Sequence, residues 1–533
     1  MSVLALSRRS ALGWMLTTLA AAVIGMPGIA LAAGEDSSVL RMVPQADLKI
    51  LDPVWTTATV TRDHGFMVYD TLFGMTDKGE IKPQMIDTYS HSADGKEWTF
   101  TLRSGLSFHD GAPVTSADVV ASLKRWGSRA SVGQLLLSAT KSIDAVNDKT
   151  FKIELAKPFG FMLDALGNPN NPLFIMPKRI AETPGTTQIT EVIGSGPYMF
   201  KKDEYSPGSK VVYLRNPKYQ PRKEPASGTA GGKKVYLERV EWVMLPDAQT
   251  QANALVSNAV DLIERIPPEQ YPAFKKDPNL VLDKQVGQGS IVMAFNHLTA
   301  PFNNPKIARA AMLAVNQQAL MRAQFIAPEM YSVNPSIYAN GTAYWSDRSA
   351  GFTGKPQFAE AKKLLKEAGY DGKPVVLMAP TDHSTHNKYP LVMAALLRQA
   401  GFNVDVQTMD WQTEIARRAK KDPVEQGGWN IFTTGFFAVD MMNPIVMAPL
   451  TGTGDKGWFG WPSSDKVEAL KMSFIEEMDP AKKKQIATAL QEEALSKALF
   501  VPLGEYVPYT AMRKNISGLI KAPVNVFWGL RKN

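Results

Sequence analysis

Strands and helices alternate along the second half of the chain, from about residue 295 onward. Residues 305–325 place Ile307, Ala311 and Leu320 on one side of a helix that begins at Pro305. The later segments are predicted in order as a helix at 358–370, a strand at 374–380, a helix at 389–401, a strand at 402–409, a helix at 411–421 and a strand at 429–437. This alternation is typical of βαβ units and predicts a largely parallel sheet.

The first third is predicted as short strands joined by turns, with isolated helices. Residues 97–102 read EWTFTL, an alternating pattern of aromatic and β-branched residues that favours a strand. Asp110 and the glycine after it form a strong turn signal. Asp118 follows Thr115 by three residues, the spacing of a capping box at the start of an apolar helix. We therefore interpret the pair His109–Asp110 as part of a turn rather than as a catalytic pair.

The Gly-, Pro- and Lys-rich stretch at 216–234 is predicted as an exposed loop. The first 33 residues are predicted as a signal peptide. Arg8 and Arg9 precede an apolar stretch, and 30–33 reads ALAA, a small-residue cleavage end. The pair resembles a twin-arginine export signal. We expect an exported, periplasmic protein that begins near residue 33 or 34, and a membrane anchor is the alternative.

Composition and charge narrow the class of protein. The chain has 533 residues, enough for two or three domains, and no cysteine, which excludes disulfides and thiolate metal sites. The net charge of +8 falls to +6 without Arg8 and Arg9, the only charged residues before residue 34. Basic residues are not interleaved with aromatic ones in blocks, so we expect no nucleic-acid partner.

Catalytic patterns are hard to find in this sequence. The six histidines are scattered, and the pair His383 and His386 lies in a polar loop without a third ligand nearby. Aromatic residues are better placed, because five tryptophans fall near predicted strand ends or loops: Trp55, Trp411, Trp429, Trp458 and Trp461. As a set they indicate a cleft that encloses an organic ligand, and core packing is the alternative for each.

A family resemblance joins these observations. Residues 82–126 resemble the signature of the extracytoplasmic solute-binding proteins of peptide- and nickel-type ABC importers, and further matches are Leu51-Asp52-Pro53, GSGPYMF at 194–200 and GGWNIFTTGFFAVDMMNP at 427–444. The resemblance implies an α/β fold of two lobes joined by a hinge, with an extra β-rich subdomain inserted into the first lobe. It implies no catalysis and no cofactor.

The implied domains are a signal peptide at 1–33, lobe I at 34–78, the inserted subdomain at 79–189, lobe I again at 190–290, lobe II at 291–499 and a return to lobe I at 500–533. The implied partners are a small molecule or short peptide and the permease subunits of an ABC transporter in the inner membrane. We expect the protein to be a monomer.

The resemblance also suggests site residues. In GFFAVDMMNP at 435–444, Asp440 takes the position of an aspartate that pairs with the ligand ammonium in peptide-binding relatives. Dipeptide-type relatives place a base for the ligand carboxylate after an earlier strand, where this chain has Asp382 and His383. The expected ligand-binding set is Asp440, Trp55, Trp411, Phe436, Phe437, Asp382, His383 and Trp458.

From these residues we expect a peptide or peptide-like solute that bears an amine and has no strict need for a free carboxylate. Two alternatives stay open. One is an exported hydrolase that uses Asp440 or a histidine as a base. The other is a carrier of a metal or metal chelate.

Overall fold

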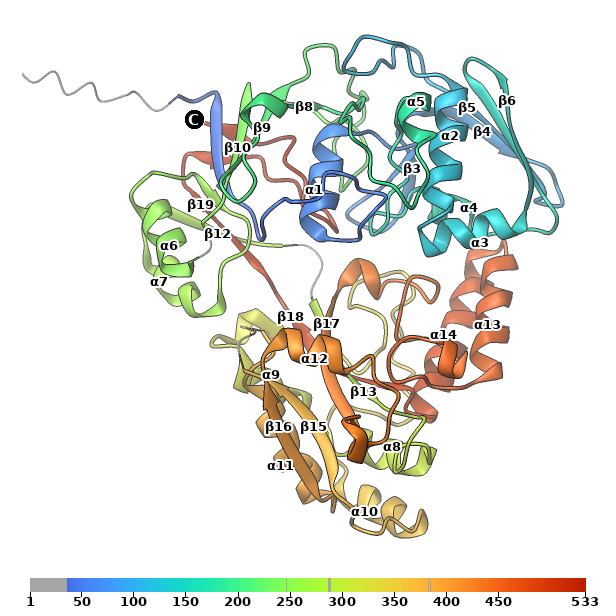
Figure 1. The fold of residues 1–533 in the computed structure, drawn as a ribbon, viewed down its shortest axis with the longest axis vertical. Coiled ribbons are helices and arrows are strands. Elements are labelled where there is room, and N and C mark those ends of the chain that lie inside the picture. The colour runs from blue at the N-terminus through green and yellow to red at the C-terminus, as the bar shows by residue number, and fades with distance from the viewer. Residues whose placement is uncertain (1–35, 246, 286–288, 382, 384) are drawn as a thin grey trace, which may run out of the picture. The chain divides into compact units, whose positions relative to one another are not determined.

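The fold is built on two large β-sheets (Figure 1). A computed structural model describes residues 36–245, 247–285, 289–381, 383 and 385–533. The predicted signal peptide and Asp382 lie outside the described residues. The segment from Ser37 to Asn533 forms one unit. Within the described part of the chain, no helix combines the length and the apolar character that a membrane crossing needs.

Lobe I is built on a seven-stranded sheet with the order β12-β19-β11-β1-β10-β9-β8. Its strands are β1 (Val39–Val43), β8 (Tyr198–Phe200), β9 (Lys210–Arg215), β10 (Arg239–Val243), β11 (Leu262–Ile263), β12 (Leu280–Lys284) and β19 (Tyr509–Arg513). Its helices are α1 (Thr59–Val68), α6 (Ala248–Val256) and α7 (Tyr271–Lys276). β1 runs parallel to both β10 and β11, so the carboxyl ends of β1 and β11 lie at the same edge.

The inserted subdomain is a four-stranded antiparallel sheet with the order β4-β5-β7-β6. Its elements are β4 (Ile86–His91), β5 (Glu97–Leu102), β6 (Thr140–Asn147), β7 (Thr150–Leu155), α2 (Ser116–Gly127), α3 (Ser131–Ala139), α4 (Met162–Leu166) and α5 (Lys178–Ala181). A separate hairpin of β2 (Phe73–Met75) and β3 (Ile81–Pro83) precedes it. The predicted strand at 97–102 is therefore confirmed.

The turn and the helix start predicted next to that sheet are also confirmed. The residue after Asp110, Gly111, has a φ of +90°, and the side chain of Asp110 accepts the N–H of Ala112 at 3.1 Å. Asp118 accepts the backbone N–H of Thr115 at 2.8 Å, which closes the capping box of α2. His109 is used structurally, since its Nε2 lies 3.1 Å from the carbonyl oxygen of Gly196.

Lobe II is built on a six-stranded sheet with the order β14-β18-β13-β17-β15-β16. Its strands are β13 (Gly289–Phe295), β14 (Tyr331–Ser332), β15 (Val375–Pro380), β16 (Val404–Met409), β17 (Ile431–Phe437) and β18 (Phe500–Tyr506). Its helices are α8 (Pro305–Leu313), α9 (Gln317–Gln324), α10 (Phe358–Glu367), α11 (Tyr389–Gln399), α12 (Trp411–Arg417), α13 (Asp465–Glu476) and α14 (Pro480–Ser496).

Two predictions about lobe II need correction. The sheet is parallel only among β15, β16 and β17, whereas β13 pairs antiparallel with both β17 and β18. The single helix predicted at 305–325 is two helices. Asn316 interrupts it, because its side chain accepts the N–H of Ala319 and so starts α9 as an N-cap.

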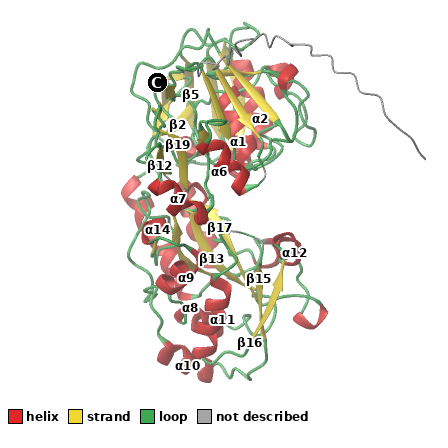
Figure 2. Cartoon of the chain, turned by 90° about the vertical axis from the view of Figure 1, so that its left-hand side faces the viewer, coloured by secondary structure: helices red, strands yellow, loops and turns green. Residues whose placement is uncertain are grey.

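The chain passes between the two sheets along two neighbouring paths, β12 to β13 and β18 to β19 (Figure 2). The N–H of Gln285 donates to the carbonyl of Pro508 at 3.0 Å and so joins the two paths. The predicted return to lobe I at residue 500 was too early. β18 pairs with β13 in the lobe II sheet, so the return lies at 507–508.

The stretch at 216–234 is not a solvated loop throughout. Its end, 228–233, is buried, and the hydroxyl of Thr229 accepts the N–H of Met75 at 2.8 Å. The Lys233 amine lies 2.7 Å from the carboxylate of Asp70, and both side chains are fully shielded from solvent. Local composition predicted exposure, but a long-range ion pair brings this segment back into lobe I.

Candidate functional site

A cavity of about 520 Å³ lies where strand ends of both lobes meet. Lobe I contributes Gln45 after β1 and Arg265 after β11, two parallel strands. Lobe II contributes the residues that follow β15 and β16 and the end of β17, and these three strands are also parallel. Ligands of α/β proteins bind at the carboxyl ends of parallel strands, so both sheets direct their loops to the place where a ligand is expected.

The lobe II wall is a cluster of aromatic rings. The centroids of His383 and His386 are 4.5 Å apart, and that of Trp411 lies 4.5 Å from His383 and 5.2 Å from His386. The hydroxyl of Thr385 lies 3.1 Å from Nδ1 of both histidines. Burial lowers the pKa of His386 to about 3, and the neighbouring His383 contributes, so His386 is neutral at physiological pH.

Metal binding by these histidines was one alternative from the sequence. Among the residues that the structure describes, no group of three His, Asp or Glu side chains converges as a metal site would require.

β17 presents an unpaired backbone edge to the cavity. The N–H of Phe437 donates to Asp440 at 2.9 Å and so points away from β13. Because strand residues two apart face the same side, the N–H of Gly435 points away from β13 as well. β15 pairs with this edge only at Leu377–Ile431, so within the described chain Gly435 has no strand partner there. The residue must be small, since an added Cβ would lie 2.9 Å from the ring of His386.

The lobe I wall supplies Arg265, the one Lys or Arg among the described residues that line the cavity. The guanidinium carbon of Arg265 lies 4.8 Å from the ring centroid of Phe437, which comes from the opposite lobe. Glu264, which directly precedes Arg265, accepts the N–H of Gln45 at 2.9 Å. Neutral polar side chains complete this wall, among them Thr59 and Gln45.

Asp440 lies in the short 3₁₀ turn after β17. It is not one of the described residues that line this cavity. One carboxylate oxygen accepts the N–H of Phe437, as described above. Burial raises the pKa of Asp440, while Arg62 of α1 and the neighbouring Asn170 lower it. Arg62 is not within ion-pair distance, so the carboxylate has no ionic partner in the described chain.

Some of the predicted site residues line this cavity, and others do not. The cavity brings together His383, Trp411, Phe436 and Phe437. Trp458 lies behind this wall, with its centroid 5.6 Å from that of Phe436. Trp55 packs beside the guanidinium of Arg129 at 5.6 Å and is not among the lining residues. Asp382 lies outside the described residues.

Sequence reasoning missed Arg265 and Gln45. Each follows a strand of lobe I, and the carboxyl ends of β1 and β11 are neighbours only in the folded sheet. The only signal in the sequence was that each residue directly follows a short apolar segment. Many residues without a function have the same position.

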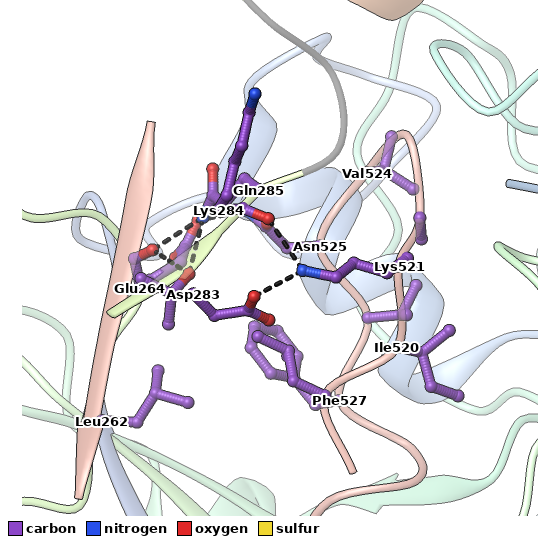
Figure 3. Close-up of a pocket in the computed structure, with 14 residues that line it drawn as sticks. Leu262, Glu264, Asp283, Lys284, Gln285, Ile520, Lys521, Val524, Asn525 and Phe527 are labelled. Atoms are coloured by element: carbon purple, nitrogen blue, oxygen red, sulfur yellow. Dashed lines mark hydrogen bonds and ion pairs between the residues drawn. The ribbon is translucent and has the colours of Figure 1, made fainter. Parts of the chain in front are cut away.

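Two further hollows lie close by. A pocket of about 30 Å³ adjoins the strand crossing, and Figure 3 shows Glu264, Asn525 and Gln285 around it, with the Lys521 amine bound to Asp283. It has room for about one water molecule. A second cavity, of about 470 Å³, is lined by Val439 and Asn443 next to the 3₁₀ turn, and the hairpin turn 76–79 lines it as well.

Comparisons with known proteins agree with this architecture. Residues 80–458 match the family model described as "Bacterial extracellular solute-binding proteins, family 5 Middle". The chain is 37% identical to a protein of Sinorhizobium fredii named as a probable peptide ABC transporter periplasmic-binding protein, over 96% of this chain and 97% of that protein. It is 26% identical to the glutathione-binding protein GsiB of Escherichia coli K12, over 88% of this chain and 89% of GsiB.

Solved structures share the fold. The PBP AgaA of A. tumefaciens R10, in complex with agropinic acid, has a TM-score of 0.73 and 24% identity, covering 93% of this chain and 99% of AgaA. DppA of Helicobacter pylori, in complex with the peptide STSA, has a TM-score of 0.74 and 22% identity, covering 93% and 98%. Together with the sheet order, the hinge crossing and the matched family model, this places the chain in family 5 of the bacterial extracellular solute-binding proteins.

Proposed function

We propose that this protein is the periplasmic substrate-binding component of an ABC importer. It captures a peptide or peptide-like solute between its lobes and delivers it to the permease subunits in the inner membrane. It acts as a monomer, without catalysis and without a cofactor. The names of the relatives, which refer to peptide and glutathione binding, support this class of ligand.

The open edge of β17 at Gly435 carries the proposal. An extended peptide backbone adds to such an edge through its own N–H and C=O groups, and the pockets beside the strand receive its side chains. The aromatic wall of His383, His386 and Trp411 then offers a surface for an apolar side chain of the ligand.

Asp440 supports the same proposal as the partner of a ligand amine. Its carboxylate is mostly buried, lies at the turn that ends β17, and has no ion pair in the described chain. A cation from the ligand would offset the cost of burying this charge.

The closing motion follows from the position of the cavity. A ligand that contacts Arg265 of lobe I and Trp411 of lobe II stabilises the arrangement in which both contacts are made. The chain crosses between the two sheets near Gln285 and Pro508, which one backbone hydrogen bond joins, and changes in backbone angles at these crossings would let the lobes close.

The test is ligand capture. The mature protein is purified, freed of bound solute by partial unfolding and refolding, and incubated with a mixture of unmodified tripeptides. Native mass spectrometry should show one retained tripeptide per chain, and small-angle scattering should show a smaller radius of gyration. Release of hydrolysed peptide, or an unchanged radius with no retained peptide, would contradict the proposal.

Export is tested separately, because the first residues lie outside the described part of the chain. We propose cleavage near Ala33 or Gly34 and transport by the twin-arginine route. N-terminal sequencing of the periplasmic protein should begin near these residues. Retention of Met1 in a membrane fraction would instead support an anchor.

A further inference from the structure

We propose that Arg265 binds an anionic group of the ligand, most simply a carboxylate, and that this cation comes from the lobe opposite the loop after β15. This inference rests on the proposed function and specifies the chemistry of its ligand. From the sequence we expected no strict need for a free carboxylate on the ligand. The structure, however, brings Arg265 in from lobe I.

The placement of Arg265 follows from lobe I itself. β11 ends at Ile263, and prolines at 267 and 268 fix the backbone just after Arg265. The side chain extends along the cavity wall and stacks on Phe437, with 4.8 Å between the guanidinium carbon and the ring centroid. A stacked guanidinium keeps its edge and its N–H donors available for a planar acceptor.

Within the described chain the guanidinium has neither a hydrogen bond nor an ion pair, although its charge acts on Asp63 and Glu264. Its Nε atom is buried and makes no hydrogen bond, and no carboxylate of the described chain comes within ion-pair distance of the group. Arg265 is partly buried, and a carboxylate that accepts two parallel N–H bonds is the partner whose geometry fits a guanidinium best. The guanidinium is therefore placed to form a salt bridge with a carboxylate of the ligand.

Nearby acids have other partners. Glu264 accepts the N–H of Gln45 and a side-chain N–H of Asn525, and Figure 3 shows its carboxylate in the small pocket with Asn525. Asp63 of α1 lies against the same Asn525. Burial raises the pKa of Asp63, with Glu264 adding to the effect, and burial also raises the pKa of Glu264, while the positive charge of Arg265 lowers both pKa values. Both acids are thus poorer ionic partners than exposed carboxylates.

The charge of the lining supports an anion. Among the described residues that line the cavity, Arg265 is the only Lys or Arg, and there is no Asp or Glu. His386 is neutral because burial lowers its pKa to about 3. Among the described lining residues, a carboxylate that enters this cavity meets one cation and no Asp or Glu. With Asp440 beyond Phe437, the two ends of the site suit a zwitterion.

The first experiment compares tripeptides that differ only in charge. The wild-type protein is incubated with a mixture of unmodified tripeptides and with the same mixture carrying amidated C-termini. Native mass spectrometry should show a preference for the free acids of about 10- to 100-fold, the range expected for a charge-assisted pair. Arg265→Met keeps the apolar stem over Phe437 and should abolish the preference. Arg265→Lys should keep part of it.

The matched control is Arg348→Met. This arginine is 69% exposed, lies 3.6 Å from Glu492 and does not belong to the residues described as lining the cavity. The variant should keep the full preference. An equal affinity of the wild type for acids and amides would overturn the inference, and so would a preference that persists in Arg265→Met.

The second experiment works without any peptide. In protein labelled with ¹⁵N-arginine, the Nε–H signal that is missing from Arg265→Met is assigned to Arg265. Titration with sodium acetate should move this signal, whereas sodium chloride at equal ionic strength should not. If acetate moves it but no tripeptide is retained in either form, the peptide assignment fails and the anion site stands. If acetate leaves it unmoved, the anion site is wrong.

Discussion

Arg125 of α2 and Asp52 form a two-pronged ion pair that solvent does not reach. Nη2 lies 2.7 Å from Oδ2 and Nη1 lies 3.1 Å from Oδ1, and the side chains are 1% and 0% exposed. Asp52 also accepts the N–H groups of Val54 and Ile189, and Arg125 donates to two backbone carbonyls. The pair therefore ties the segment after β1 to the inserted subdomain.

Removal of one partner should be costly. Arg125→Met leaves a buried carboxylate without its cation, and we expect the free energy of unfolding to fall by about 3–5 kcal/mol. Urea unfolding of the ligand-free protein measures the change, and Arg348→Met serves as the exposed control. The double variant Arg125→Met with Asp52→Asn should cost less than the sum of the two single variants. Additive costs would show that the two side chains act independently.

Glu414 predicts a pH effect on stability. Burial raises its pKa to about 8, against the opposing influence of Arg418 one turn later. The unfolded chain ionises this group near its usual pKa, so the folded state loses relative stability as pH rises from the usual value toward 8. Below that range both states are protonated and no penalty applies.

Glu414→Gln removes this penalty. Between pH 5 and pH 8 the stability of the variant should gain on that of the wild type by about 3–4 kcal/mol, since one pKa unit corresponds to about 1.4 kcal/mol. The control is Glu425→Gln, at an exposed position in the same lobe. Thermal unfolding at several pH values measures both, and a pH-independent difference for Glu414→Gln would rule out an ionisation linked to folding.

The features that the sequence predicted well are local ones. The capping box at Thr115 and Asp118 and the strand at 97–102 each depend on neighbours in the chain, and both are present. The helix predicted at 358–370 is present as α10, and Gly369 just after it has a φ of +67°. The aromatic members of the site were found because they follow strands of one consecutive βαβ series.

The features that the sequence could not show depend on distant pairing. Arg265 reaches the cavity because β11 lies beside β1, about 220 residues earlier in the chain, as the bond from Arg41 to Asp261 illustrates. Lys233 is buried because Asp70 lies across lobe I from it. Neither pairing produces a periodic pattern in the sequence. Composition alone therefore predicted an exposed loop around Lys233 and gave no prediction for Arg265.

Trp411 should contribute most of the aromatic binding energy. It lines the cavity against both histidines, whereas Trp55 packs on Arg129 away from the lining. We expect Trp411→Leu to weaken binding of retained tripeptides by about 2 kcal/mol, as for a buried aromatic contact. Trp55→Leu should leave the affinity unchanged, and a loss of equal size in both variants would place Trp55 in the site after all. Calorimetric titration compares the two variants.

Asp440 either contacts a ligand amine or stabilises the protein itself, and substitution by asparagine distinguishes the two roles. Asparagine retains an oxygen that accepts the N–H of Phe437, so Asp440→Asn should keep the turn after β17 and the fold. It removes the charge that a ligand amine would meet. For tripeptides with a free amine we expect affinity to fall by about 2–5 kcal/mol, with little change for the same peptides acetylated at the N-terminus.

The acetylated peptides separate ligand recognition from stability. If the carboxylate serves the protein through Arg62 and Asn170 instead, Asp440→Asn should lower the melting temperature without ligand and weaken both peptide forms equally. Scattering adds a third reading, since Arg62 belongs to lobe I and Asp440 to lobe II. A larger radius of gyration in the ligand-free variant would show that this charge helps to hold the lobes together. A free-amine preference that survives in Asp440→Asn would contradict the amine contact.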